Sequence, residues 1–216
     1  MNDTLGRPRP AFTTERFYLE QVAQHKGGIA MLQRHVNRYK WASSHLVGAE
    51  LVLDAGCGSG YGDHILLNSA KMVIGVDQSP EAIAYAQWKA STLKQNRVRY
   101  EIMDMGLLSR KRLGLVERVD AVVCIEVIEH LKMHDQQAFL NSLDQIIRPT
   151  GKLLITTPEK NEVTGTMKTE FHENEFTREE FRSFLCERFY SVRFDDPKRF
   201  KIPSDFLLGV CEGMIS

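Results

Sequence analysis

A row of glycines at alternate positions follows a short apolar run near residue 50 of the chain. The glycines are Gly56, Gly58, Gly60 and Gly62, and the run before them is 52–55. Glycine permits sharp turns and a close approach of the backbone to a ligand. The segment therefore predicts a buried strand, a ligand-binding loop and a helix that begins near Tyr61.

The glycine spacing excludes the fingerprint of a nicotinamide dinucleotide site. A GxGxxG pattern requires glycine at position 61 or 63, where the chain has Tyr61 and Asp63. Asp54, two residues before the first glycine, also argues against a dinucleotide site, because its carboxylate would repel a pyrophosphate. The same carboxylate suits a ligand that carries an ammonium and a sulfonium group.

The segment 54–60 resembles the first motif of the class I S-adenosylmethionine-dependent methyltransferases. Four later segments match the other motifs of that family, in order; they are 73–77, 103–105, 120–131 and 149–158. One departure is Thr150, which stands where the fifth motif usually has a second glycine. The resemblance covers residues 48 to about 195, and five ordered motifs are far more specific than one glycine loop.

This resemblance implies S-adenosylmethionine as the cofactor and S-adenosylhomocysteine as its demethylated product. Asp77 falls at the place of the ribose-binding carboxylate of the family, and Asp104 falls at the place of the adenine-contacting acid. The complete set of cofactor-binding residues that we expect is Asp54, Gly56, Cys57, Gly58, Asp77, Gln78, Asp104, Met105, Glu126 and Arg38.

Arg38 and Tyr39 lie on a predicted helix that folds over the cofactor site in this family. Arg38 would bind the methionine carboxylate with two parallel hydrogen bonds, and Tyr39 would line the acceptor pocket. The alternative is an ordinary amphipathic helix in which Tyr39 is buried and Arg38 is solvated.

Methyl transfer to a hydroxyl group requires a base for its proton, and histidine suits that role near neutral pH. The predicted catalytic residues are His172, in the loop after the fifth predicted strand, and His130, at the end of the fourth predicted strand. For both, a structural histidine bonded to backbone is the alternative. The other five histidines are expected on helix surfaces or in loops; they are His25, His35, His45, His64 and His134.

A metal site is a second hypothesis for the same region. The spacing of Glu126, Glu129 and His130 would gather three ligands on one helical face, and His172 would complete the set. The arrangement resembles that of the metal-dependent methyltransferases that modify the terminal 2′-hydroxyl of small RNAs. The same string is also common in metal-free members of the superfamily, and our prediction is a site without metal.

Short apolar runs alternate with helical stretches after residue 48, as expected for parallel strands covered by helices. We predict an α/β, Rossmann-like, doubly wound sheet of seven strands in the order 3-2-1-4-5-7-6. Strand 7 is expected to be antiparallel because no crossover helix separates the last two strands, near 191–194 and 206–210. Two N-terminal helices should lie over the cofactor site.

The 216 residues, of which 43% are hydrophobic, suffice for one domain with a large core. Residues 1–16 are predicted to form a flexible arm, and 17–216 a single methyltransferase domain. Within it, 17–47 is the helical cap and 48–216 the Rossmann-like core. Predicted helix signals include Ser79 with Pro80 at a helix start and Thr177 with Glu180 as a capping box.

The charge balance argues against nucleic-acid binding, because 28 Lys and Arg residues offset 28 Asp and Glu residues. The four cysteines lie far apart in apolar surroundings, which predicts reduced, buried thiols and a cytoplasmic protein. No signal peptide and no apolar run of about 18 residues is present, so we expect no membrane partner. The sequence does not decide whether the chain forms a homodimer.

The flanking segments 35–42 and 171–180 resemble small bacterial methyltransferases of glycan and natural-product biosynthesis. The predicted function is methyl transfer to a small molecule or sugar, at a hydroxyl oxygen. An amine acceptor remains open because an amine needs no dedicated base. The two other hypotheses are an RNA 2′-O-methyltransferase that depends on a metal and a non-catalytic S-adenosylmethionine-binding module.

Overall fold

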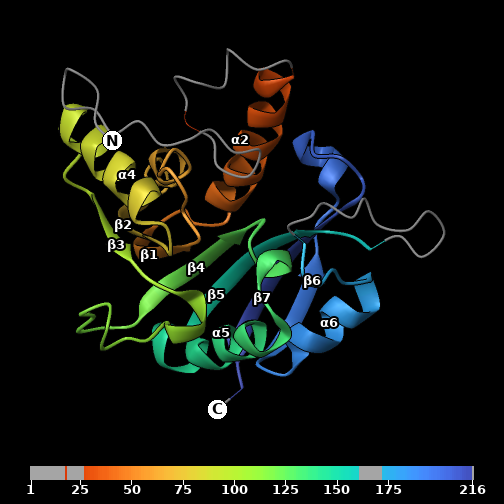
Figure 1. Cartoon of the computed structure of the whole chain (residues 1–216). Helices are drawn as coiled ribbons and strands as arrows, with labels where there is room; N and C mark the ends of the chain where they lie inside the picture. The colour runs from red at the N-terminus through yellow and green to blue at the C-terminus, as the bar shows by residue number, and fades with distance from the viewer. Residues whose placement is uncertain (1–17, 19–26, 161–171, 216) are drawn as a thin grey trace.

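The computed structural model describes Tyr18 and residues 27–160 and 172–215. The described residues form one seven-stranded sheet with helices on both faces (Figure 1). The predicted arm 1–16 lies outside the described residues, as does the first of the two predicted N-terminal helices except for Tyr18.

The strand order of the sheet is β3-β2-β1-β4-β5-β7-β6, which confirms the predicted topology. Strands β1 to β5 are parallel, and β7 is antiparallel to both β5 and β6. The strands are β1 (Ala49–Ala55), β2 (Ala70–Asp77), β3 (Val98–Ile102), β4 (Val119–Ile125), β5 (Ile147–Pro158), β6 (Phe189–Phe194) and β7 (Phe206–Met214).

The described α-helices are α2 (Gly28–Ser44), α3 (Asp63–Leu66), α4 (Pro80–Thr92), α5 (Met133–Ile146) and α6 (Arg178–Cys186). Two predicted helix starts are confirmed. The Ser79 hydroxyl accepts a hydrogen bond from the Ala82 backbone at the start of α4, and Thr177 forms a complete capping box with Glu180 at the start of α6. Short 3₁₀ turns follow β3, β4 and β6; they are η1 (Met105–Leu107), η2 (Ile128–His130) and η3 (Pro197–Phe200).

Helices α5 and α6 cover one face of the sheet, while α2, α3 and α4 lie on the other side in Figure 1. On the first face, Phe139 of α5 and Phe181 of α6 pack into the main core without exposure to solvent. On the second face, Trp41 and Leu66 pack against Val52 and Val123 of the sheet. Both faces of the central strands are therefore buried, as expected for a parallel sheet.

A buried tryptophan of helix α2 donates a hydrogen bond to the segment that follows the edge strand β6. Trp41 is fully buried, and its indole Nε1 donates to Asp195 Oδ2 at 2.9 Å. His45 Nε2 contacts the same carboxylate oxygen at 2.9 Å. Asp195 follows β6 directly, so the helix that carries Arg38 and Tyr39 is tied to the last strands as well as to the first.

Cys186 is exposed, so the prediction of four buried thiols is wrong at this position. Leu185 and Phe181 bury one face of α6, and the residue after Leu185 is rotated by about 100° from that face. Cys57, Cys124 and Cys211 are buried and free, as predicted. No helix in the described part of the chain is long and apolar enough to cross a bilayer.

Candidate active site

The glycine loop joins β1 to α3 and is tied to the end of β2. The backbone N–H groups of Gly56 and Cys57 both donate to the Val76 carbonyl, at 2.8 and 2.9 Å. Gly56 has φ of 86°, and a Cβ atom there would lie 2.3 Å from a methyl carbon of Val127. Only glycine satisfies both conditions, so Val127, just after β4, packs directly against the loop.

Asp77 ends β2, and backbone donors hold its carboxylate. Oδ2 accepts from the Gly58 N–H at 3.0 Å, and Oδ1 accepts from the Ser79 N–H at 2.8 Å. The residue is 8% exposed and lines the pocket above the loop. A carboxylate placed in this way accepts hydrogen bonds from ribose hydroxyls, which is the role that the sequence predicts.

The pocket at the carboxyl ends of β1, β2 and β4 contains about 860 Å³ of space, part of it open to solvent. This size suits a small-molecule ligand, and the place is where doubly wound sheets bind theirs. A Cβ atom on Gly58 would meet nothing within 4 Å, so the loop leaves open space for a ligand. Seven of the predicted cofactor residues line the pocket: Gly56, Cys57, Gly58, Asp77, Gln78, Met105 and Glu126.

Three predicted cofactor residues lie elsewhere, so their contact with the cofactor stays a prediction. Asp54 is fully buried behind the loop. Asp104 is exposed, and its Oδ1 accepts from the Gly106 N–H at 2.8 Å at the start of η1. Arg38 is 2% exposed and is paired with Glu126, so the alternative of a solvated Arg38 is wrong.

His35 lines the pocket, which corrects its predicted place on a helix surface or in a loop. Burial, and then the charge of Arg38, lower the pKa of His35 to about 3, so its imidazole is neutral at physiological pH. The sequence contained a usable signal, since His35 precedes Tyr39 by four residues and both share one face of α2. Tyr39 meets the ring of Tyr61 edge to face at 5.6 Å, and both line the pocket.

Arg38 and Glu126 form a buried ion pair beside the pocket. Arg38 Nη2 lies 3.4 Å from Glu126 Oε2, and its guanidinium lies 3.9 Å above the ring of Phe206. The other two guanidinium nitrogens, Nε and Nη1, have no hydrogen-bond partner among the described residues. Burial raises the pKa of Glu126, whereas Arg38 and the hydroxyl of Thr156, 2.7 Å away, lower it.

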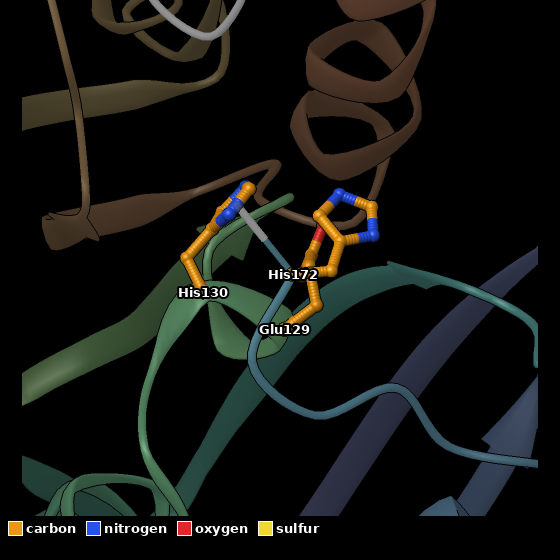
Figure 2. A group of neighbouring side chains, drawn as sticks. All are labelled: Glu129, His130 and His172. Atoms are coloured by element: carbon orange, nitrogen blue, oxygen red, sulfur yellow. The ribbon is translucent and has the colours of Figure 1, made fainter. Parts of the chain in front are cut away.

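Figure 2 shows that His130 of η2 and His172 of the loop before α6 converge over Glu129. The two imidazole rings meet edge to face with centroids 5.0 Å apart. His172 Nδ1 lies 2.5 Å from Glu175 Oε1, so a carboxylate orients this ring. The described lining of the pocket includes His130 but not His172.

Glu129 is buried beneath the two histidines. Its Oε2 accepts from the Thr157 hydroxyl at 3.2 Å, and its Oε1 has no hydrogen-bond partner among the described residues. Burial, followed by the charge of Glu126, raises its pKa well above the usual range. The Glu129 carbonyl accepts from the backbone of Glu173 and Asn174, which fixes the histidine loop against η2.

The predicted single helical face of metal ligands does not form. Glu126 adopts a left-handed conformation with φ of 55° directly after β4, and the short η2 turn follows. This break separates Glu126, which faces Arg38, from the other ligands. One ligand atom from each of Glu129, His130 and His172 nevertheless lies within 4.8 Å of the others, so three of the four hypothetical ligands are together.

Comparisons with known proteins agree with this geometry. A methyltransferase domain model matches residues 47–192. A probable S-adenosylmethionine-dependent methyltransferase of Mycolicibacterium smegmatis is 32% identical over 159 residues, which cover 71% of this chain and 56% of the relative. A ubiquinone biosynthesis O-methyltransferase of Coxiella burnetii is 32% identical over 51% of this chain and 44% of its own length.

Among solved structures, the methyltransferase domain of bacterial CtHen1-C resembles this chain with a TM-score of 0.65 and 28% identity. The match covers 83% of this chain and 98% of that domain. The chain spans about half the length of the curated relatives it matches.

Proposed function

Because the chain belongs to the class I S-adenosylmethionine-dependent methyltransferases, we propose that it methylates a hydroxyl oxygen of a small molecule or sugar. The observation that carries this proposal is the pairing of His172 with Glu175, next to a second histidine that lines the pocket. A histidine oriented by a carboxylate is suited to remove a hydroxyl proton near neutral pH.

The cofactor, when bound, supplies an electrophilic methyl group on its sulfonium. The chain's own residues then have three tasks. Asp77 and the glycine loop hold the nucleoside. The Glu175 carboxylate accepts the Nδ1 hydrogen of His172, which leaves Nε2 as the atom that takes a proton. His130 contacts the His172 ring and extends the pair to the pocket.

The test is turnover of the His172→Ala and His130→Ala proteins with S-adenosylmethionine and a panel of hydroxylated acceptors, followed by mass spectrometry. We expect either substitution to lower turnover by about 10²- to 10⁴-fold while cofactor affinity stays within about a factor of two. His134→Ala is the matched control, since this side chain is 75% exposed on α5. Full activity of the His172→Ala protein would remove His172 from the reaction.

A second candidate function is metal-assisted methyl transfer to a ribose 2′-hydroxyl of RNA. The observation that favours it is the cluster of Glu129, His130 and His172 together with the unpartnered Glu129 Oε1. Two imidazoles and a carboxylate are a donor set that binds divalent transition metals.

Chelation separates the two candidates. If the three residues bind a metal, a chelator should abolish turnover, and Mn²⁺ or Mg²⁺ should restore it. If the chelator leaves turnover unchanged and the His172→Ala substitution lowers it strongly, the result supports a base that acts without metal. Cofactor binding without turnover on any acceptor class would instead support a non-catalytic binding module.

We further infer a cytoplasmic location, because the buried thiols of Cys57, Cys124 and Cys211 are unpaired, as expected in a reducing compartment. Fractionation of cells that express the tagged protein tests this. Recovery from an oxidising compartment, with these cysteines in disulfides, would contradict it.

A further inference from the structure

Two carboxyl groups lie together behind the glycine loop, and the mechanism above uses neither. Asp54 is near the end of β1, Asp63 is the first residue of α3, and both are fully buried. Asp54 pairs in register with Gly75 of β2, and a Cβ atom on Gly75 would lie 2.9 Å from Asp63 Oδ2. The missing side chain at Gly75 therefore makes room for the second carboxyl beside the first.

No donor with ordinary hydrogen-bond geometry reaches the four carboxyl oxygens within the described part of the chain. The contacts that remain are one between the two carboxyl groups, which requires a shared proton, and looser ones from the Tyr39 hydroxyl to Asp54 and from the Tyr100 hydroxyl to Asp63, which lower the two pKa values. Burial raises the pKa of Asp54 to about 7, and Asp77 adds to the rise. Burial, followed by the charge of Asp54, raises the pKa of Asp63 well above its usual range.

The titratable groups that face the pair come from every element packed around it. They are Tyr39 of α2, Cys57 and Tyr61 of the loop, Asp77 of β2, Tyr100 of β3 and Cys124 of β4. None of these groups is a cation, and Asp77 is the one carboxylate among them. The pair therefore gains charge near neutral pH without a positive group in this set to balance it.

The pocket is next to this charge, separated from it by the loop residues that line the pocket. The cofactor and its product differ by one methyl group and one positive charge, because transfer converts a sulfonium into a neutral thioether. In a protein interior, a full charge on one side of a thin loop acts strongly on a charge on the other side. The ionised pair thus favours the cationic ligand over the neutral one.

We propose that Asp54 and Asp63 form a proton-sharing pair that raises the affinity for S-adenosylmethionine relative to S-adenosylhomocysteine when it is ionised. The inference rests on the proposed function for the identity of the product. It makes Asp63 a specificity-determining residue that promotes exchange of product for fresh cofactor. Since cation binding favours the ionised pair, binding of S-adenosylmethionine should also release a proton from it.

The experiment is calorimetry of both ligands at pH 5.5 and pH 7.5 with the intact chain. We expect the affinity ratio of cofactor to product to rise on the order of tenfold between these pH values. Sinefungin, which carries an ammonium where the methylsulfonium stands, should follow the cofactor. In Asp63→Asn, an amide faces Asp54 and keeps it ionised, so the ratio should stay high at both pH values.

Asp120→Asn is the matched control. Asp120 lies at the opposite end of β4, where its Oδ2 accepts from the Glu50 and Leu51 backbones, so this variant should keep the wild-type pH dependence. If Asp63→Asn does not fold, proton release is counted on the wild-type chain in buffers of different ionisation enthalpy. A flat wild-type ratio, or equal proton release with both ligands, would overturn the inference. Neither measurement requires turnover, so it stands or fails separately from the proposed acceptor.

Discussion

Backbone groups shape one side of the pocket, and charged side chains shape the other. On the cofactor side, made of the glycine loop and Asp77, the backbone N–H groups of Gly58 and Ser79 hold the carboxylate. On the histidine side, Glu126 and His130 line the pocket, and Glu129 and His172 lie next to them outside its described lining. The partners there are side chains such as Arg38, Thr157 and Glu175.

Both sides also retain buried polar atoms without a partner among the described residues, and behind the glycine loop these are the four carboxyl oxygens of Asp54 and Asp63. Within the described residues, Arg38 Nε and Nη1, Glu129 Oε1 and Glu175 Oε2 are buried without partners, and all belong to the histidine side or contact it. Unpaired buried groups are unfavourable unless a ligand satisfies them. The difference teaches that backbone donors hold Asp77 in place before a ligand binds, whereas the histidine side retains capacity for an acceptor or a metal.

The largest effect is expected from breaking the cofactor side at Asp77. Asp77→Ala removes two charge-assisted hydrogen bonds to ribose and should weaken S-adenosylmethionine binding by about 2–4 kcal/mol. Calorimetry measures this, and Asp104→Ala is a comparison that shows whether the second predicted acid, which is exposed outside the pocket, also contributes to binding. Unchanged affinity of the Asp77→Ala protein would remove this residue from the site.

On the histidine side, Glu126→Gln should affect stability rather than only binding. The substitution leaves the buried Arg38 guanidinium without its carboxylate, so we expect a loss of about 1.5–3 kcal/mol in the free energy of unfolding. Urea denaturation tests it. The double variant Arg38→Met with Glu126→Gln should recover part of the loss, and additive losses would show that the two residues act independently.

Gly62 tests whether the loop and α2 are packed as closely as the structure indicates. A Cβ atom at Gly62 would lie 2.1 Å from the Tyr39 ring, so Gly62→Ala should destabilise the fold by about 1–3 kcal/mol. Thermal denaturation measures this effect. Tyr39→Leu shortens the obstructing side chain, and the two substitutions together should therefore cost less than their sum. Strict additivity would contradict the contact.

The smallest effect is a pH dependence at His35, which lines the pocket. The pKa of His35 in the folded chain, about 3, lies below its ordinary value of 6.5, so the unfolded chain binds a proton between these values and the native chain does not. Stability should fall as pH falls from 6.5 toward 3. His35→Gln should reduce that fall by about 1 kcal/mol at about pH 5.8. Identical melting curves against pH for both proteins would refute the assignment.

Much of the cofactor side was predictable because its residues are close in sequence. The glycines, Asp77 and the cap at Ser79 act through local backbone geometry, so their types and spacing suffice to predict the loop, the strand end and the helix start. The strand order was predictable for a related reason, since the alternation of strands and helices permits few parallel arrangements. Asp104 illustrates the limit, because its motif position did not predict its exposure.

Only the tertiary structure decided which of the charged side chains meet one another. The contacts of His172 with His130, of Arg38 with Glu126 and of Asp54 with Asp63 depend on how separate elements pack. The left-handed turn at Glu126 also separated residues that a helical spacing would have joined. Sequence thus determined the fold and the cofactor loop through local periodicity and backbone geometry. Burial and partner choice of the charged side chains followed from long-range packing, which local pattern does not encode.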